Sequence, residues 1–151
     1  MIPARHGPLA KAIRMSSEAN KAVIRRVNTE AFAGGSLAAF KELVAADFIN
    51  RTAPPGTPNG PETLWNTFQN ILRPALSQLS VEIHDQVAED DKVTTRKTFS
   101  GVHTGVLMGI EPTGRSVSID VIDIVRIRDG QYAEHWGINT LPLVLAELRK
   151  A

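Results

Sequence analysis

The sequence contains no cysteine among its 151 residues. This absence excludes disulfide bonds, thiolate catalysis and the zinc sites that cysteine ligands build. No phosphate-binding loop, dinucleotide-binding fingerprint or serine nucleophile motif is present, so we expect no cofactor. A metal is not expected either, because the histidines show no ligand spacing and fall on different predicted elements: His6, His84, His103 and His135.

The sequence also lacks a charge excess of one sign and a long apolar run. The formal net charge is +1 and the basic residues are scattered, which excludes the electrostatic pattern of a nucleic-acid-binding protein. No apolar run approaches the roughly 20 residues that cross a bilayer. We therefore expect a cytoplasmic protein that acts on a small, largely apolar molecule, with no nucleic-acid or membrane partner.

Length and composition predict one folded domain. A hydrophobic fraction of 42% is sufficient to form a core in a chain of this size. Residues 1–14 contain three basic residues, no acid and no signal-peptide hydrophobic segment. We interpret residues 1–15 as a flexible extension, arising from a misassigned start or acting as a packing arm, and residues 16–151 as the domain.

The first half of the domain has helical periodicity. Ser16 or Ser17 can cap a helix that ends at Gly34-Gly35, and Ser36 can cap a second helix. Pro61 suits the first turn of a third helix. Between the last two lies TAPPGTPNGP, whose four prolines and two glycines predict a loop that forms a lid or pocket rim.

From Leu79 onward apolar and polar residues alternate, which predicts four antiparallel strands ending near Ile138. Asp129-Gly130 is a preferred two-residue hairpin turn. That turn sets Asp123 opposite Trp136, and it sets Val125 opposite Glu134. A short helix capped by Asn139 or Thr140 follows. The predicted fold is α+β, with three helices on one face of a strongly curved antiparallel sheet that forms a cone with an open mouth.

Asp123 interrupts an apolar row on the first arm of this hairpin. Burial among apolar side chains should raise the pKa of this carboxyl toward the range useful for a general acid or base. In the alternative interpretation, Asp123 is hydrogen-bonded to Trp136 or His103 and only rigidifies the cone.

A second acid, Asp85, lies on the apolar row of an earlier strand. If Asp90-Asp91 is the turn of that hairpin, Asp85 pairs with Arg96, and Ile83 pairs with Thr98. We favour a structural ion pair, although Arg96 and its partner could instead contact a substrate carboxylate or enolate.

Several other side chains are candidates for the pocket. His103 could orient Asp123 or protonate a carbonyl, or it could be a loop histidine bonded to the backbone. Asn50 and Arg51 lie where the second helix leads into the proline-rich loop, and Arg51 could bind an acidic group or merely cap that helix. Trp136 and Trp65 are expected to form pocket walls, and Glu134 is expected to be exposed.

His135 is predicted on the opposite, convex face of the sheet, together with Ile122 and Ile124. Exposed β-branched residues on that face indicate an interface between copies of the chain. We therefore expect a homodimer or homotetramer formed through the convex face.

The motifs in the second half of the chain resemble one family. The sequence reads GVHTG over residues 101–105 and PTGR over 112–115, and then DIVR, DG and EHW over 123–126, 129–130 and 134–136. This order and spacing resemble the SnoaL-like polyketide cyclases of the NTF2-like, or cystatin-fold, superfamily, over roughly residues 18–148. Two positions depart from the usual pattern: Arg51 replaces a frequent histidine, and Thr140 stands where the last strand often ends in an aspartate.

The resemblance implies an intramolecular aldol condensation without a cofactor, with an aspartate as general acid and base. Asp123 and His103 are then the catalytic candidates, and Asn50, Arg51, Arg96, Trp136 and Trp65 are the candidates for binding a carbonyl-containing substrate. Two other functions stay open: a non-catalytic small-molecule-binding domain, and a hydrolase or dehydratase that uses the same pocket.

Overall fold

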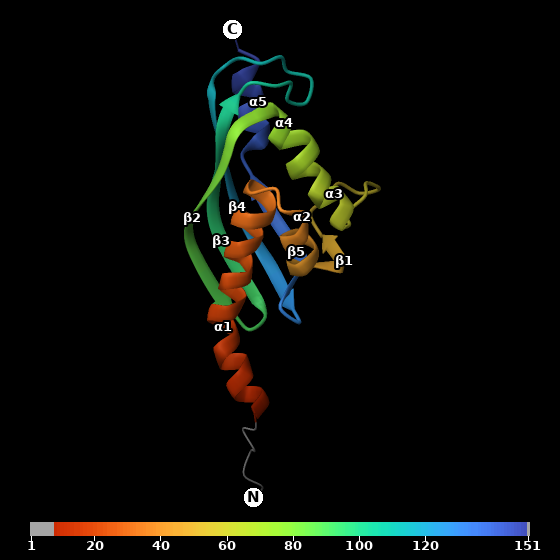
Figure 1. Ribbon diagram of the computed structural model, residues 1–151, viewed down its shortest axis with the longest axis vertical. Helices are drawn as coiled ribbons and strands as arrows, with labels where there is room; N and C mark the ends of the chain where they lie inside the picture. The colour runs from red at the N-terminus through yellow and green to blue at the C-terminus, as the bar shows by residue number, and fades with distance from the viewer. Residues whose placement is uncertain (1–7, 151) are drawn as a thin grey trace, which may run out of the picture.

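The computed structural model describes residues 8–150 of the chain. Five strands form one curved sheet in the order β1-β5-β4-β3-β2 (Figure 1). The neighbours β2 to β5 pair antiparallel, whereas β1 runs parallel to β5 at the edge. The strands are β1 Val44–Asn50, β2 Leu76–Glu89, β3 Lys92–His103, β4 Ser116–Arg128 and β5 Gln131–Asn139.

The helices pack on one face of this sheet (Figure 1). The first helix continues from α-helical into π-helical geometry, and the same change occurs in the third. The helical elements are α1 Pro8–Arg26, η1 Val27–Ala33, α2 Leu37–Leu43, α3 Pro61–Asn66, η2 Thr67–Leu72, α4 Arg73–Ala75 and α5 Leu141–Leu148. The α+β fold with helices covering one side of a curved sheet is confirmed.

Two predicted helix starts are confirmed and one is wrong. The Ser36 hydroxyl accepts a hydrogen bond from the backbone N–H of Ala39, and Pro61 occupies the first turn of α3. By contrast, α1 begins at Pro8 and passes through Ser16 and Ser17, so neither serine is its N-cap. The predicted extension over 1–15 is therefore helical from Pro8, and its first seven residues lie outside the described part of the chain.

Strand β1 was not predicted. Its residues do not alternate between apolar and polar, because Val44, Ala45 and Phe48 are buried while the two residues between Ala45 and Phe48 are exposed. The strand pairs parallel with β5, and that partner lies more than 80 residues further along the chain. This pairing leads the chain from α2 across the sheet edge and into the proline-rich loop.

The two predicted hairpin turns are confirmed. Asp129 and Gly130 have φ of 53° and 73°, the left-handed conformations that a two-residue turn of this type requires. Asp90 and Asp91 connect β2 to β3, and Asp85 pairs with Arg96 as expected. A register shift after Ile83 places that residue opposite Lys97 rather than Thr98, and it leaves Asp85 exposed on the outer face.

A β-bulge in β5 overturns the predicted register of the last hairpin. Arg126 pairs with Glu134 and Ile127 pairs with Tyr132, so Ala133 has no partner across the ladder. Asp123 therefore lies opposite Gly137, and Val125 lies opposite His135. One extra residue on one strand moves every later side chain to the other face.

The bulge exchanges two predicted positions. His135 turns toward the helix-covered face, and Trp136 turns toward the outer face, where it pairs with Ile124. Ile122 and Ile124 are exposed there as predicted, at 55% and 39%, and Ile138 is 81% exposed beside Ile122. Assembly through this face stays a prediction.

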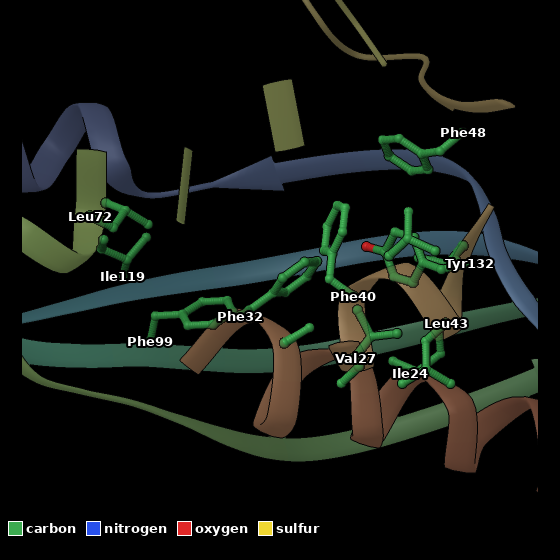
Figure 2. Packing of buried hydrophobic residues seen from close by; sticks show 14 of the residues in the cluster. Ile24, Val27, Phe32, Phe40, Leu43, Phe48, Leu72, Phe99, Ile119 and Tyr132 are labelled. Atoms are coloured by element: carbon green, nitrogen blue, oxygen red, sulfur yellow. The ribbon is translucent and has the colours of Figure 1, made fainter. Parts of the chain in front are cut away.

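The core lies between the helices and the inner face of the sheet (Figure 2). Aromatic rings from several elements meet there: Phe32 stacks on Phe68 with ring centroids 4.0 Å apart, and Tyr132 meets Phe32 edge to face. These contacts fix η1 and η2 against β5 and leave room between them for a cavity. None of the described helices is long and apolar enough to cross a membrane.

The segment after β3 depends on a glycine at position 105. The Gly105 N–H donates to the Ala75 carbonyl oxygen, and a Cβ at this position would lie 2.1 Å from the Pro74 carbonyl oxygen. Because that oxygen belongs to the backbone, it cannot move aside as a flexible side chain can.

We expect Gly105→Ala to lower the free energy of unfolding by about 1–3 kcal/mol, the usual range for overpacking a rigid site. Urea denaturation monitored by circular dichroism measures this. Gly60→Ala is the control, because a Cβ there would meet nothing within 4 Å. Equal stabilities of the two variants would contradict the prediction.

Candidate active site

A cavity of about 470 Å³ lies between the inner face of the sheet and the helices. Its walls are largely apolar and include Phe32, Phe48, Phe68, Phe99, Ile119 and Val121. The proline-rich loop lines it from Thr52 to Gly60, as the prediction of a pocket rim requires. A few polar side chains converge in this apolar setting, which is the usual composition of a small-molecule site.

Asp123 lies in this cavity wall and is 2% exposed. Its Oδ2 accepts a hydrogen bond from Lys97 Nζ at 2.9 Å. Lys97 lies on the neighbouring strand β3, is also 2% exposed, and donates a second hydrogen bond to Asn28 Oδ1 at 2.8 Å. The sheet therefore holds a buried ion pair at the cavity, with Asn28 of η1 as its third member.

His135 is the second neighbour of this carboxylate. Its Nε2 lies 3.3 Å from Asp123 Oδ2, and its Nδ1 lies 3.1 Å from Asn50 Oδ1. Asn50 Oδ1 also accepts hydrogen bonds from the backbone N–H and hydroxyl of Thr52. These donors identify that atom as an acceptor, so His135 donates to it through Nδ1. When both ring nitrogens carry a proton, the imidazolium is held at both, by Asn50 and by Asp123.

The second carboxylate oxygen of Asp123 is available. Asp123 Oδ1 is buried and has no hydrogen-bond partner among the described residues. Buried polar atoms without partners are rare in folded proteins, and they point to a ligand or another group that completes the site. Because Asp123 lines the cavity, a bound molecule can supply that missing donor.

Asp123 is predominantly ionised. Burial alone would raise the pKa of its carboxyl, but the positive charge of Lys97 and the hydrogen bond with His135 act in the opposite direction, and the pKa falls below its ordinary value. The sequence-based expectation of a raised pKa for Asp123 is therefore wrong. That expectation considered the apolar row alone and did not include a lysine at the same depth.

Tyr132 adds a neutral donor to the cavity wall. Burial and the nearby charge of Asp123 raise the pKa of the Tyr132 phenol well above its usual value. The phenol therefore keeps its proton at neutral pH and can donate a hydrogen bond to a ligand oxygen.

Most of the other predicted site residues lie away from this cavity. Of the binding candidates, only Asn50 lines it. Arg96 pairs with Asp85 at 2.6 Å on the outer face, and Arg51 pairs with Glu134 at 2.5 Å. The favoured interpretation of Asp85 and Arg96 as a structural ion pair is thus confirmed, and in both cases the chain itself supplies the carboxylate that the guanidinium binds.

The two tryptophans do not form walls of this cavity. The bulge turns Trp136 outward, where the Arg126 guanidinium lies 6.0 Å from the centre of its ring. Trp65 packs on Phe40 with centroids 5.0 Å apart and lines a separate, more open groove between α2, β1 and α3.

His103 is buried at the end of β3 and does not line the cavity. The backbone N–H of Thr113 donates to its Nδ1 at 3.2 Å, and the Thr113 hydroxyl lies 3.0 Å from the same atom. His103 therefore holds the loop that follows β3, and it does not orient Asp123. Asp123 is likewise bonded to neither Trp136 nor His103, contrary to the purely structural interpretation.

Sequence reasoning missed Lys97 and misplaced His135. Lys97 carried a usable signal, because it lies at period two between Val93 and Phe99, as Asp123 does between apolar residues. No comparable signal marks the bulge at Ala133. The described residues contain no group of three or more histidine, aspartate or glutamate side chains that could hold a metal ion.

We expect Lys97→Met to destabilise the fold by about 3–5 kcal/mol, because it leaves the buried Asp123 carboxylate without its cation. The same change should raise the pKa of Asp123, since the charge of Lys97 is one of the causes that lower it. Urea denaturation and carboxyl ¹³C NMR titration measure the two effects. Lys41→Met, at an exposed position of α2, is the control. Unchanged stability of Lys97→Met would contradict the prediction.

The lowered pKa of Asp123 also predicts that the free energy of unfolding decreases at acidic pH. A carboxyl whose pKa is lower in the folded chain stabilises it above the unfolded pKa, which is about 4, and that contribution is lost as the pH falls through the folded pKa. Asp123→Asn should therefore show a shallower loss of stability below about pH 4 than the wild type. Denaturation midpoints measured across that range test this, and parallel curves would contradict it.

Solved structures of two Streptomyces proteins resemble this chain. The chain superposes on IdmH from Streptomyces antibioticus, a proposed polyketide cyclase, with 31% identity and a TM-score of 0.70, over 85% of this chain and 97% of that one. TsrD from Streptomyces laurentii matches with 26% identity and a TM-score of 0.75, over 87% and 94%.

A third solved structure supports the fold. A protein from Catenulispora acidiphila with a ketosteroid isomerase-like fold matches with 18% identity and a TM-score of 0.63, over 82% of this chain and 89% of that one. No curated protein matches the chain in sequence. The sequence model of one family, however, matches residues 22–145. The chain therefore belongs to the SnoaL-like polyketide cyclase family, which has the NTF2-like fold.

Proposed function

We propose that this protein is a cofactor-independent cyclase that closes a ring by proton transfer on a carbonyl substrate, with Asp123 as the general base and acid. The observation that carries the proposal is the free Oδ1 of Asp123, a buried carboxylate oxygen without a partner in the wall of an apolar cavity. Membership of the family and the likeness to IdmH support a cyclase-type role.

The proposed ring closure needs only one proton, which Asp123 takes from the substrate and later returns to it. Asp123 Oδ1 takes a proton from a carbon next to a carbonyl group, and an enolate forms. The enolate carbon attacks a second carbonyl carbon of the same molecule, so that one C–C bond forms and an alkoxide is left. Asp123 returns its proton to that alkoxide, and no oxidant, reductant or metal enters the balance.

The charges around Asp123 suit an anionic intermediate. The carboxylate becomes neutral when it takes the proton, while the Lys97 ammonium stays 2.9 Å from its Oδ2 and remains buried. A cation held in a low-dielectric cavity then stabilises the enolate formed beside it. Lys97 also lowers the pKa of Asp123, which makes the carboxylate a weaker base. Proton abstraction therefore depends on the stabilisation of the enolate by Lys97.

His135 and Tyr132 complete the proposed machinery. The imidazole keeps the carboxylate oriented through Oδ2, which leaves Oδ1 without a protein donor. The neutral Tyr132 phenol is available as a hydrogen-bond donor to a substrate carbonyl oxygen. His103 has no part in this proposal, because it lies outside the cavity.

Proton abstraction can be tested without the natural substrate. In D₂O the wild type should accelerate exchange of the protons between the two carbonyls of ethyl benzoylacetate, followed by ¹H NMR at a pD where uncatalysed exchange is slow. Asp123→Asn should reduce the catalysed rate by about 100-fold or more, the usual contribution of a general base.

Asp120→Asn is the matched control for this experiment. Asp120 lies three residues earlier on β4, and its exposed carboxylate accepts a hydrogen bond from the Thr98 hydroxyl. It should exchange at the wild-type rate. An Asp123→Asn variant that is equally fast would refute the base assignment. Binding of the ester by the wild type without any exchange would favour a non-catalytic binding domain.

A further inference from the structure

We infer that Gly137 is a positioning residue: the absence of a side chain at this position lets the His135 imidazole reach from β5 to Asp123 on β4. The inference rests on the proposed function for its catalytic meaning. Its structural content is independent, because it concerns the contact between two side chains.

The pairing of β4 with β5 explains why the His135 imidazole must extend along the strand to contact Asp123. His135 lies opposite Val125, and Asp123 lies one inward-facing pair further along, opposite Gly137. For His135 Nε2 to approach Asp123 Oδ2 to 3.3 Å, the imidazole must lean along β5 and pass over Gly137. A glycine there offers a flat surface for the ring.

The space above Gly137 is fully used by that ring. A Cβ built on Gly137 would lie 2.6 Å from His135 Cε1 and 2.8 Å from His135 Nε2, closer than real Cβ contacts. The colliding atoms include the nitrogen that contacts Asp123. Any other residue at position 137 therefore competes directly with the His135–Asp123 contact.

Conformational freedom is not the reason for this glycine. Gly137 is absent from the set of described glycines with positive φ, which includes Gly130 at 73° in the hairpin turn. Its backbone is an ordinary strand backbone that other residues can adopt. The requirement at position 137 is therefore space alone.

Neither side of the contact can move away easily. The Gly137 N–H donates to the Thr52 hydroxyl at 3.1 Å, which holds the strand in place. The Thr52 hydroxyl donates to Asn50 Oδ1, and the same oxygen holds His135 through Nδ1. The ring and the strand are thus fastened to one another by Asn50 and Thr52, and an added methyl group would meet a fixed imidazole.

The expected consequence is a change in the ionisation of Asp123. The charged or titratable groups near its carboxyl are Lys97, His135 and Tyr132, and His135 is one of those that lower its pKa. Displacing the imidazole removes this contribution while Lys97 stays. Gly137→Ala should therefore raise the pKa of Asp123, although it alters neither of the two partner side chains.

A double-mutant cycle tests the inference. The pKa of Asp123 is measured by carboxyl ¹³C NMR titration, and the thermal midpoint by circular dichroism, in Gly137→Ala, His135→Ala and the double variant. Each single variant should raise the pKa of Asp123. In the His135→Ala background, Gly137→Ala should have a much smaller effect on both quantities, because the nearest remaining contact of the new Cβ is Asp123 Cβ at 3.3 Å, which a shift of a few tenths of an ångström relieves.

Several outcomes would overturn the inference. The first is a Gly137→Ala variant with the wild-type pKa of Asp123, and the second is an equal loss of thermal stability with and without the imidazole. If Gly137→Ala alone does not fold, a folded double variant supports a clash with His135 and an unfolded one refutes it. Gly60→Ala is the control for the general effect of replacing glycine. None of these readouts requires turnover, so they stand apart from the exchange experiment.

Discussion

The buried ion pair between Lys97 and Asp123 is the constraint on which the rest of the site depends. Two charges at 2% exposure are tolerated inside a fold only when each has a partner and further hydrogen bonds. Asn28 from η1 and His135 from β5 supply those hydrogen bonds. The pair therefore links the first helical segment, β3, β4 and β5 at one point, and that point is the polar wall of the cavity.

This arrangement determines which chemistry suits the site. An isolated buried carboxyl would be protonated and could serve as an acid first, whereas Asp123 is ionised and can only begin as a base. The cation that keeps it ionised is also positioned to stabilise the anion that proton abstraction creates. A reaction that starts from a neutral carbonyl compound and passes through an enolate uses both properties.

The local features of the fold could be predicted from the sequence, and the distant pairings could not. Asp129-Gly130 and Ser36 follow local rules of turn and cap chemistry, and both predictions are confirmed. Asp123 was found because an acid in an apolar row contradicts the pattern around it. Strand β1 was missed because its partner is far away in the sequence and its residues do not alternate.

The composition of the site was harder to predict than its location. The Asp129-Gly130 turn is predicted correctly, yet a single unpaired residue at Ala133 reverses the inner and outer sets of side chains beyond it. His135 and Trp136 exchanged places for this reason alone. A lysine and a histidine inside the cavity in turn reversed the direction of the Asp123 pKa shift.

The bulge at Ala133 has a consequence for how such a site can change. Because side chains alternate along a strand, pairing the same residues without the bulge, with Ala133 opposite Arg126, would bring the indole of Trp136 to the inner face and carry the imidazole of His135 to the outer face. Asp123 would keep its lysine and lose its histidine, with no substitution at either position. In this fold a slip of one residue in strand pairing can therefore remodel the cavity wall as thoroughly as several point substitutions.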